Sequence, residues 1–166
     1  MKKLILPLAL VAFSLLPGAQ RAEAFARATP DGSFLSATLP GPAKDKSGTR
    51  DTVVGDITHN TLSTADGDAE FSITATQLPG FVTTVTTDNM IYRKARNELL
   101  GNYSARRTAW RKCSHAGHEC RKLRYRTGDG RRGMARFYLD GDTLVVANAV
   151  YRGDKDGARD FLASVR

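Results

Sequence analysis

The sequence predicts an antiparallel α+β domain of about seven strands and two helices. Three observations support this class. Residues 33–151 contain short segments that alternate apolar and polar side chains and are mostly joined by short turns rich in Gly, Asp and Pro. Residues 88–103 and 154–166 instead place apolar side chains at helical spacing. Only the link that holds the first helix is long, and no segment repeats, which favours one antiparallel sheet in one domain.

The first 24 residues are expected to be a secretory signal peptide. Lys2 and Lys3 give a positive start, and residues 4–19 form an apolar stretch that is too short for a stable membrane span. The tripeptide AEA at 22–24 fits the small-x-small rule for cleavage, and AFA at 24–26 is the alternative site. We therefore expect an exported protein, periplasmic or secreted, without a membrane span after cleavage.

Removal of residues 1–24 takes away three basic residues and one acidic residue, so the formal net charge falls from +8 to +6. Residues 25–32 are interpreted as a short N-terminal extension and residues 33–166 as a single domain. That length is enough to bury most of what the unfolded chain exposes, so the fold need not depend on a metal or a crosslink.

Strands are expected at 33–40, which ends in a Pro-Gly-Pro turn, and at 51–62 and 69–78. The polar residues 43–51 between the first two are interpreted as a loop. The last two flank an Asp-Gly turn signal and predict a hairpin in which Leu62 meets Phe71. Residues 79–86 are interpreted as a crossing rich in proline and threonine.

A helix is expected from Thr87 or Asp88, either of which can cap it. Its apolar face repeats at i+4 through Ile91, Ala95, Leu99 and Tyr103, with fraying near Gly101. A strand at 133–139 should align Ala135, Phe137 and Leu139 with Leu123 and Tyr125. Residues 143–151 are apolar on both faces, which is typical of a strand covered on each side. Ala158, Phe161, Leu162 and Val165 predict a short amphipathic closing helix.

The only two cysteines, Cys113 and Cys120, lie with two of the three histidines in KCSHAGHECRK at 112–122. Outside a reducing cytosol, two nearby cysteines are expected to oxidise, and the spacing C-x-H-x2-H-x-C is unlike that of tetrahedral zinc sites. We therefore favour a disulfide over a metal site. In an antiparallel hairpin, this pairing places Trp110 opposite Leu123 and Thr108 opposite Tyr125 on one face.

The other face of that hairpin should collect basic residues, with Arg107 opposite Arg126, Ala109 opposite Arg124 and Arg111 opposite Lys122. The positive charge is regional: residues 93–136 sum to +11, residues 25–92 to −4 and residues 137–166 to −1. We predict that this face binds an acidic protein or a polyanion. Its candidate residues are Arg107, Arg111, Lys122, Arg124 and Arg126, with Arg131 or Arg136. The alternative is a solvated face that only keeps the protein in solution.

A catalytic reading uses His115 and His118 as a general acid and base, with His59 joining them and Glu119 as the one indicated carboxylate. GDGRRG at 128–133 matches GxGxxG, but a strand pair follows it, so it is interpreted as a hairpin turn. The sequence has neither a GxSxG elbow nor a GxxxxGK[ST] loop. No cofactor or metal is indicated.

Three segments, SFLSATLPGPA at 33–43, GMARFYLDGDTLVVANAVY at 133–151 and ARDFLASVR at 158–166, have a distinctive pattern of packing residues and turns. In this pattern the chain resembles bacterial exported domains of the PsbP-like fold, and the resemblance covers nearly the whole chain after the leader. It is carried by Phe34, Leu39, Pro40, Gly41, Phe137, Phe161 and Leu162, although Pro42 follows the LPG directly. It implies an α/β/α sandwich and adaptor or assembly roles more often than catalysis, and it carries over no catalytic residue.

Three functions are therefore considered. The first is an exported, non-catalytic binding or assembly module that uses the basic sheet face. The second is a binder of polyanions, such as phosphate-bearing glycans or nucleic acid, and the third is a small histidine-dependent hydrolase. The sequence does not decide among them.

Overall fold

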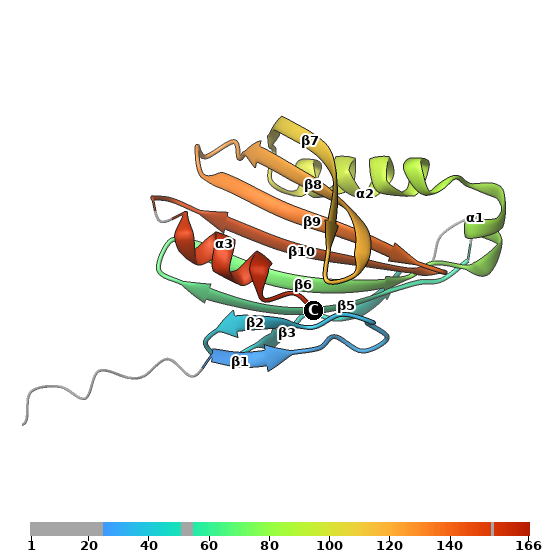
Figure 1. Ribbon diagram of the computed structural model, residues 1–166, viewed down its shortest axis with the longest axis horizontal. Coiled ribbons are helices and arrows are strands. Elements are labelled where there is room, and N and C mark those ends of the chain that lie inside the picture. Colours follow the sequence, from blue (N-terminus) through green and yellow to red (C-terminus); the bar gives the residue numbers. More distant parts are fainter. Residues whose placement is uncertain (1–24, 51–54, 154) are drawn as a thin grey trace, which may run out of the picture.

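The computed structural model describes residues 25–50, 55–153 and 155–166. The described elements are ten strands and three helices, arranged as a curved main sheet with helices on both sides and a small two-stranded sheet below it (Figure 1). In chain order they are β1 (Phe25–Ala28), β2 (Ala37–Pro40), β3 (Lys44–Asp45), β4 (Gly48–Arg50), β5 (Ile57–Asp66), β6 (Ala69–Gln77), α1 (Gly80–Val85), α2 (Asp88–Asn102), β7 (Arg106–His115), β8 (His118–Arg126), β9 (Arg132–Asp140), β10 (Thr143–Tyr151) and α3 (Asp156–Ala163).

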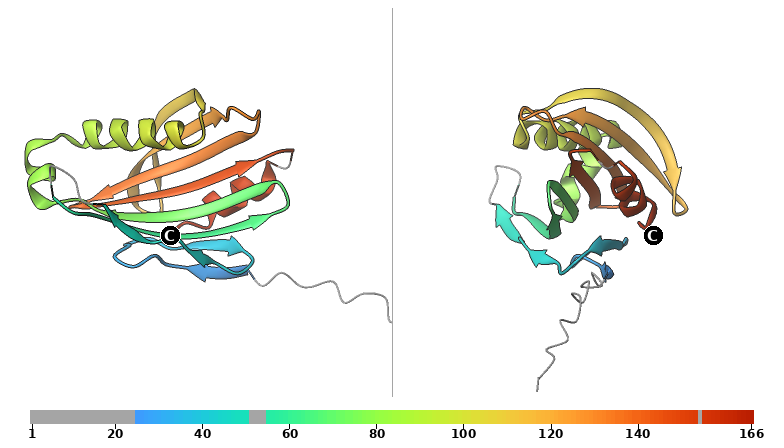
Figure 2. Two further views of the ribbon diagram at one scale, coloured as in Figure 1. Left: turned by 180° about the vertical axis from the view of Figure 1, so that it is seen from behind. Right: turned by 90° about the vertical axis from the view of Figure 1, so that its left-hand side faces the viewer.

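The main sheet has the order β3-β5-β6-β10-β9-β8-β7, with β4 also pairing with β5, and every pairing is antiparallel. Helix α2 lies on one side of it and α3 on the other (Figures 1 and 2). We call these sides the α2 face and the α3 face. The predicted α+β class with a mostly antiparallel sheet is confirmed. Within the described residues, no helix is both long and apolar enough to cross a membrane.

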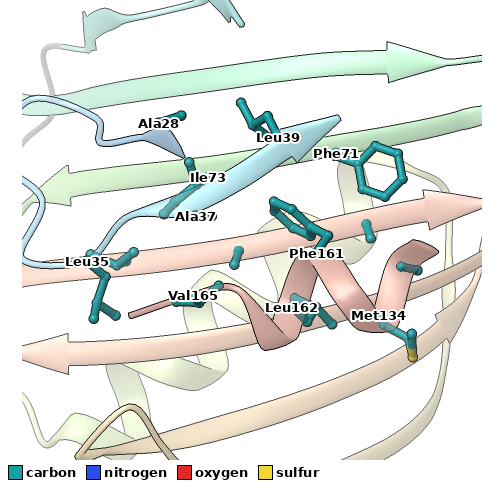
Figure 3. Packing of buried hydrophobic residues seen from close by; sticks show 14 of the residues in the cluster. Ala28, Leu35, Ala37, Leu39, Phe71, Ile73, Met134, Phe161, Leu162 and Val165 are labelled. Atoms are coloured by element: carbon teal, nitrogen blue, oxygen red, sulfur yellow. The ribbon is translucent and has the colours of Figure 1, made fainter. Parts of the chain in front are cut away.

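Each face of the sheet has its own apolar core. On the α3 face, Phe161, Leu162 and Val165 pack with Leu39 and Ile73, so the closing helix is seated on β2 and the middle of the sheet (Figure 3). On the α2 face, the predicted helical stripe packs against strands β7 to β10 through Ile91, Ala95, Leu99 and Tyr103. Strand β10 lies between the two cores, and eight of its nine residues are buried, as its apolar sequence predicted.

The hairpin of β5 and β6 differs from the predicted one by two residues. Its turn lies at Gly67 and Asp68, between the paired Asp66 and Ala69, so Phe71 lies opposite Thr64 rather than Leu62. Gly67 has a φ of +53°, a left-handed conformation that glycine adopts without strain. A shift of two residues keeps each side chain on its face, and Leu62 still packs against the α3-face core.

Three segments with weak patterns were predicted incorrectly. Residues 33–40 form a strand only from Ala37, and it pairs with β1, which lies in the segment expected to be a short extension. The expected polar loop at 43–51 contains β3 and β4, whose residues are exposed and pair with β5. The expected crossing at 79–86 contains α1, which has no buried residue. Residues 51–54 of the expected strand 51–62 lie outside the described residues.

Candidate binding surface

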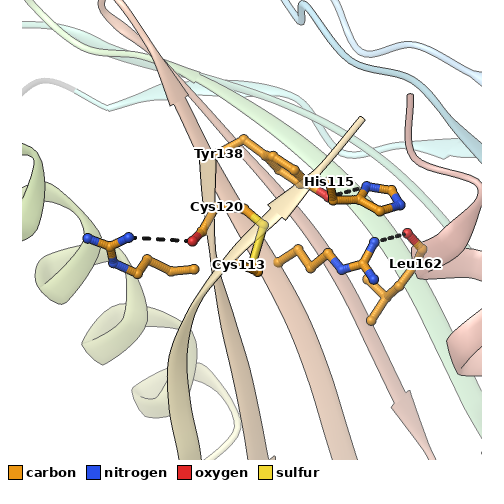
Figure 4. The surroundings of a disulfide bond; sticks show 7 residues. Cys113, His115, Cys120, Tyr138 and Leu162 are labelled. Carbon is orange, nitrogen blue, oxygen red and sulfur yellow. Dashed lines mark hydrogen bonds between the residues drawn. A yellow bond between two sulfur atoms is a disulfide. The ribbon is translucent and has the colours of Figure 1, made fainter. Parts of the chain in front are cut away.

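Cys113 and Cys120 are paired across β7 and β8, with an S–S distance of 2.06 Å. The same register places Trp110 opposite Leu123 and Arg111 opposite Lys122, as predicted. Trp110 and Leu123 pack in the α2-face core, where the indole contacts Phe137 edge-on at 5.4 Å between ring centroids. The cystine lies on the other side, because Cys120 belongs to the α3-face core (Figure 4).

The register changes at Thr108, which is the extra residue of a bulge in β7. Beyond it, Arg106 lies opposite Arg126 and Arg107 lies opposite Tyr125, so the predicted pairs Arg107–Arg126 and Thr108–Tyr125 are wrong. Because one extra residue reverses the alternation, the side chain of Arg107 lies on the α2 face. Burial, and then the charges of Arg107 and Arg93, lower the pKa of Arg96 on α2, in agreement with this placement.

Cations from three neighbouring strands share the α3 face. Arg106, Arg126 and Arg132 are opposite one another across β7, β8 and β9, and Arg111, Lys122 and Arg136 form a second such row. Arg124 lies between the rows, beside Ala109 and Met134. We call these residues the basic face: Arg106, Arg111, Lys122, Arg124, Arg126, Arg132 and Arg136.

The electrostatics of Lys122 show how close these charges are. Burial lowers the pKa of its ammonium, and the charges of Arg124, Arg136 and Arg159 lower it further. Arg159 belongs to α3 and is ion-paired with Asp156 of the same helix at 3.2 Å, so the helix brings both a cation and a carboxylate to the border of this surface. Among the residues that the structure describes, no member of the basic face forms an ion pair with a carboxylate.

Two predicted binding residues have contacts within the protein. The guanidinium of Arg131 contacts Glu70 at 2.5 Å and Asp129 at 2.8 Å, so its charge is neutralised by two carboxylates. The bond to Glu70, more than the one to Asp129, raises the pKa of Arg131. Arg136 donates from Nη1 to the carbonyl oxygen of Leu162 at 2.7 Å, so it holds the C-terminal end of α3 against the sheet (Figure 4). We therefore leave Arg131 out of the basic face and treat Arg136 as its inner border.

The three histidines do not converge. His115 and His118 are opposite each other at the tip of the β7–β8 hairpin. The His115 Nδ1 lies 3.1 Å from the Tyr138 hydroxyl, and the His118 ring packs on Phe34 at 5.1 Å. His59 is hydrogen-bonded to Thr76 on β5 and β6, at the other end of the strand order and on the α2 face.

Glu119, the carboxylate of the predicted acid–base site, is also too poorly placed to act with the histidines. Glu119 lies opposite Ser114 on the α2 face, whereas the two neighbouring histidines point to the α3 face. Burial and then the charge of Arg136 lower the pKa of His115, opposed by a hydrogen bond to the backbone of Ala163. Within the described part of the chain, no group of three or more His, Cys, Asp and Glu side chains could hold a metal ion.

Sequence reasoning missed Arg106, Arg132 and Arg159. Arg132 could have been found, because it precedes Met134 and Arg136 at intervals of two and must share their face. Arg106 depends on the bulge, and Arg159 depends on where α3 packs. Neither placement leaves a signal in the local pattern.

The fold resembles known structures, whereas the sequence does not match known families. No family model matches the chain, and no curated protein matches it. The structure is similar to that of cyanobacterial PsbP (CyanoP) from Synechocystis, with a TM-score of 0.57 and 13% identity over 91% of this chain and 96% of that one. The chain therefore has the PsbP-like fold.

Two other solved structures are less similar. One is a protein of unknown function from Pseudomonas aeruginosa, described as a putative regulator, with a TM-score of 0.38, 15% identity and coverage of 64% of this chain and 83% of that one. The other is from Bacteroides thetaiotaomicron, with a TM-score of 0.37, 14% identity and coverage of 80% of this chain and 44% of that one.

Replacement of both cysteines by alanine should weaken the hairpin without unfolding the domain. The loop that the disulfide closes spans a sequence separation of only 7. Closing so short a loop contributes about 2 to 3 kcal/mol to the free energy of unfolding. Urea unfolding of the wild type and of Cys113→Ala/Cys120→Ala should show this difference, and a reductant should lower the stability of the wild type only. A double variant that does not fold would show that the disulfide is essential to the fold.

Proposed function

We propose that the protein is a non-catalytic binding module of the cell envelope that holds an acidic partner on its basic face. An acidic protein is the first candidate, and a polyanion offers the same chemistry. The observation that carries the proposal is the arrangement of cations in register on β7, β8 and β9, without a paired carboxylate among the described residues.

The arrangement has an energetic cost that a bound anion would offset. Four pairs of like charges are directly opposed: Arg106–Arg126, Arg126–Arg132, Arg111–Lys122 and Lys122–Arg136. Each such pair costs about 0.2 to 1 kcal/mol on a sheet. Arginine side chains are also well suited to bind an anion, because the planar guanidinium donates two parallel hydrogen bonds to a carboxylate or a phosphate.

An envelope location agrees with the proposal. The first 24 residues have the composition of a secretory signal peptide, and an oxidised Cys113–Cys120 pair is typical of proteins outside the cytosol. In that setting, the domain would meet acidic proteins and phosphate-bearing glycans.

The proposal is tested by removing equal charge from the two sides of the sheet. The test variant is Arg106→Gln/Lys122→Gln/Arg111→Gln, and the control is Arg93→Gln/Lys94→Gln/Lys112→Gln, whose residues are exposed on the α2 side. On an immobilised heparin matrix, the test variant should elute at distinctly lower salt than the wild type.

The salt dependence of binding should change as well. Each lost phosphate- or sulfate-type contact should reduce the slope of log K against log salt by about 0.7 to 0.9. The control should elute close to the wild type. Equal losses in the two variants would mean that only net charge matters, and the proposal would be rejected.

A further inference from the structure

A small pocket lies at the end of the basic face, between the end of β8, the start of β9 and Lys155, the residue before α3. Its volume is about 240 Å³. Four cations line it: Arg124 and Arg126 from β8, Arg132 from β9 and Lys155 next to the start of α3. The rest of the wall consists of Thr108 at the β7 bulge, Tyr125, Gly133, Met134 and Tyr151. No acidic residue is among the described lining residues.

The register explains why these cations meet. Arg126 and Arg132 are directly opposite each other, and such partners have Cβ atoms about 4.5 to 5.5 Å apart. Arg124 is two residues before Arg126, so it points to the same side one step along the strand. Arg106 continues the row on the next strand, which leaves Arg126 with cations on both sides. Among the described residues, none of the four lining cations has a carboxylate within ion-pair distance.

Size and charge together select the ligand. The volume is below the range of about 300 to 1,000 Å³ that pockets for drug-sized ligands occupy, so the pocket suits one compact group. Four cations are more than a single negative charge requires. A phosphomonoester carries about −1.5 to −2 charges at pH 7 and three acceptor oxygens, which matches several arginine forks better than a carboxylate does.

A second pocket on the same side of the sheet has the opposite character. It has a volume of about 500 Å³, its wall includes Phe71 and Phe161, and it carries three carboxylates, Asp66, Asp68 and Asp160, and one cation, Arg152. Tyr151 borders both pockets. The acidic pocket would repel an anion, so the position of a bound phosphate is restricted to the basic one.

We propose that the basic pocket binds a phosphomonoester group, which anchors the partner at the end of the basic face. This inference rests on the proposed function and deepens it, because it names the group that the pocket recognises. The rest of the basic face then contributes attraction that depends on charge, and the pocket contributes the preference for a terminal phosphate.

The test is an NMR titration with methyl phosphate and, as the matched diester, dimethyl phosphate. The wild type should bind the monoester at least about tenfold more tightly, because only the monoester loses a second proton, with a pKa near 6. For the same reason, the affinity for methyl phosphate should fall about tenfold from pH 7 to pH 5. Arg126→Gln/Arg132→Gln should lose at least about tenfold in affinity, whereas Arg93→Gln/Lys94→Gln, which removes two exposed charges from the α2 side, should stay within about threefold. Equal binding of monoester and diester, or equal losses in the two variants, would overturn the inference.

Two possible sources of the phosphomonoester, a lipid headgroup and a soluble sugar phosphate, are distinguished by further binding measurements. Preferential binding to vesicles that contain phosphatidate over vesicles of phosphatidylglycerol, a diester, would support a lipid headgroup. Tight binding of glucose 6-phosphate without that vesicle preference would support a soluble sugar phosphate. Retention on heparin that depends on Arg106, Arg111 and Lys122, without monoester binding, would reject the pocket and leave the proposed function standing. Absence of both this charge-dependent heparin retention and monoester binding would reject the proposed function and the phosphomonoester pocket.

Discussion

Replacement of Gly133 by alanine should lower the free energy of unfolding by about 3 kcal/mol and the Tm by about 10 °C. A Cβ atom at this position would lie 2.0 Å from Cζ of Tyr125, which is opposite Gly133 across β8 and β9. The ring cannot move aside cheaply. It is 2% exposed, and its hydroxyl donates to Oδ1 of Asn148 at 2.7 Å. Thermal and urea unfolding of the purified variant measure the loss.

Two further variants separate this clash from the general effect of replacing glycine. Gly101→Ala places its Cβ in open space near the end of α2, so it should leave stability unchanged or raise it by up to about 1 kcal/mol. In a Tyr125→Ala background, Gly133→Ala should cost less than about 1 kcal/mol, because the ring that it meets is gone. If Gly133→Ala proved as stable as Gly101→Ala, the packing of Tyr125 over Gly133 would be wrong.

Replacement of Phe161 by alanine should cost about 3 to 5 kcal/mol, which is the usual loss for a buried aromatic side chain. Phe161 is 3% exposed and contacts Phe71 edge-on at 5.4 Å between ring centroids. The helix that carries it has only 8 residues and depends on this packing, because short helices are marginal by themselves. Urea unfolding measures the change.

The exposed Asp160 of the same helix provides the control. Asp160→Ala should change stability by less than about 0.5 kcal/mol, as is usual for surface positions. A loss below about 1 kcal/mol for Phe161→Ala would show that α3 does not need this contact.

The parts of the fold that the sequence predicts are those in which two independent patterns agree. In the cystine hairpin, the pairing of Cys113 with Cys120 and the burial of Trp110 with Leu123 require the same register, and the structure has it. The closing helix and β10 were likewise marked by apolar side chains that have only one way to be buried.

The remaining features lacked such agreement. Residues 106–108 read Arg-Arg-Thr, so no apolar side chain marks the face, and the bulge at Thr108 cannot be seen in them. Strands β3 and β4 are exposed, and α1 buries no side chain, so their segments lack the periodicity that would reveal them. The contact of Arg131 with Glu70 joins residues 61 positions apart, and local patterns do not report such pairs.

The bulge in β7 decides which arginine of this strand lies on the basic face. It moves Arg107 to the α2 face, brings Arg106 into line with Arg126 and Arg132, and opens the wall of the basic pocket at Thr108. Without it, Arg107 would lie opposite Arg126 and Arg106 would lie on the α2 face, so the bulge decides which of the two arginines joins the row.

The most direct measurement of the central claim is an NMR titration of the arginine side-chain Nε–Hε signals with a heparin oligosaccharide. These signals report the face of the sheet on which each guanidinium lies, which backbone amides do not. We expect the signals of five arginines on the basic face to shift together and saturate: Arg106, Arg111, Arg124, Arg126 and Arg132. The signals of Arg93, Arg107 and Arg121, on the α2 side, should stay unchanged. Equal shifts on both sides, or shifts confined to the α2 side, would contradict the central claim.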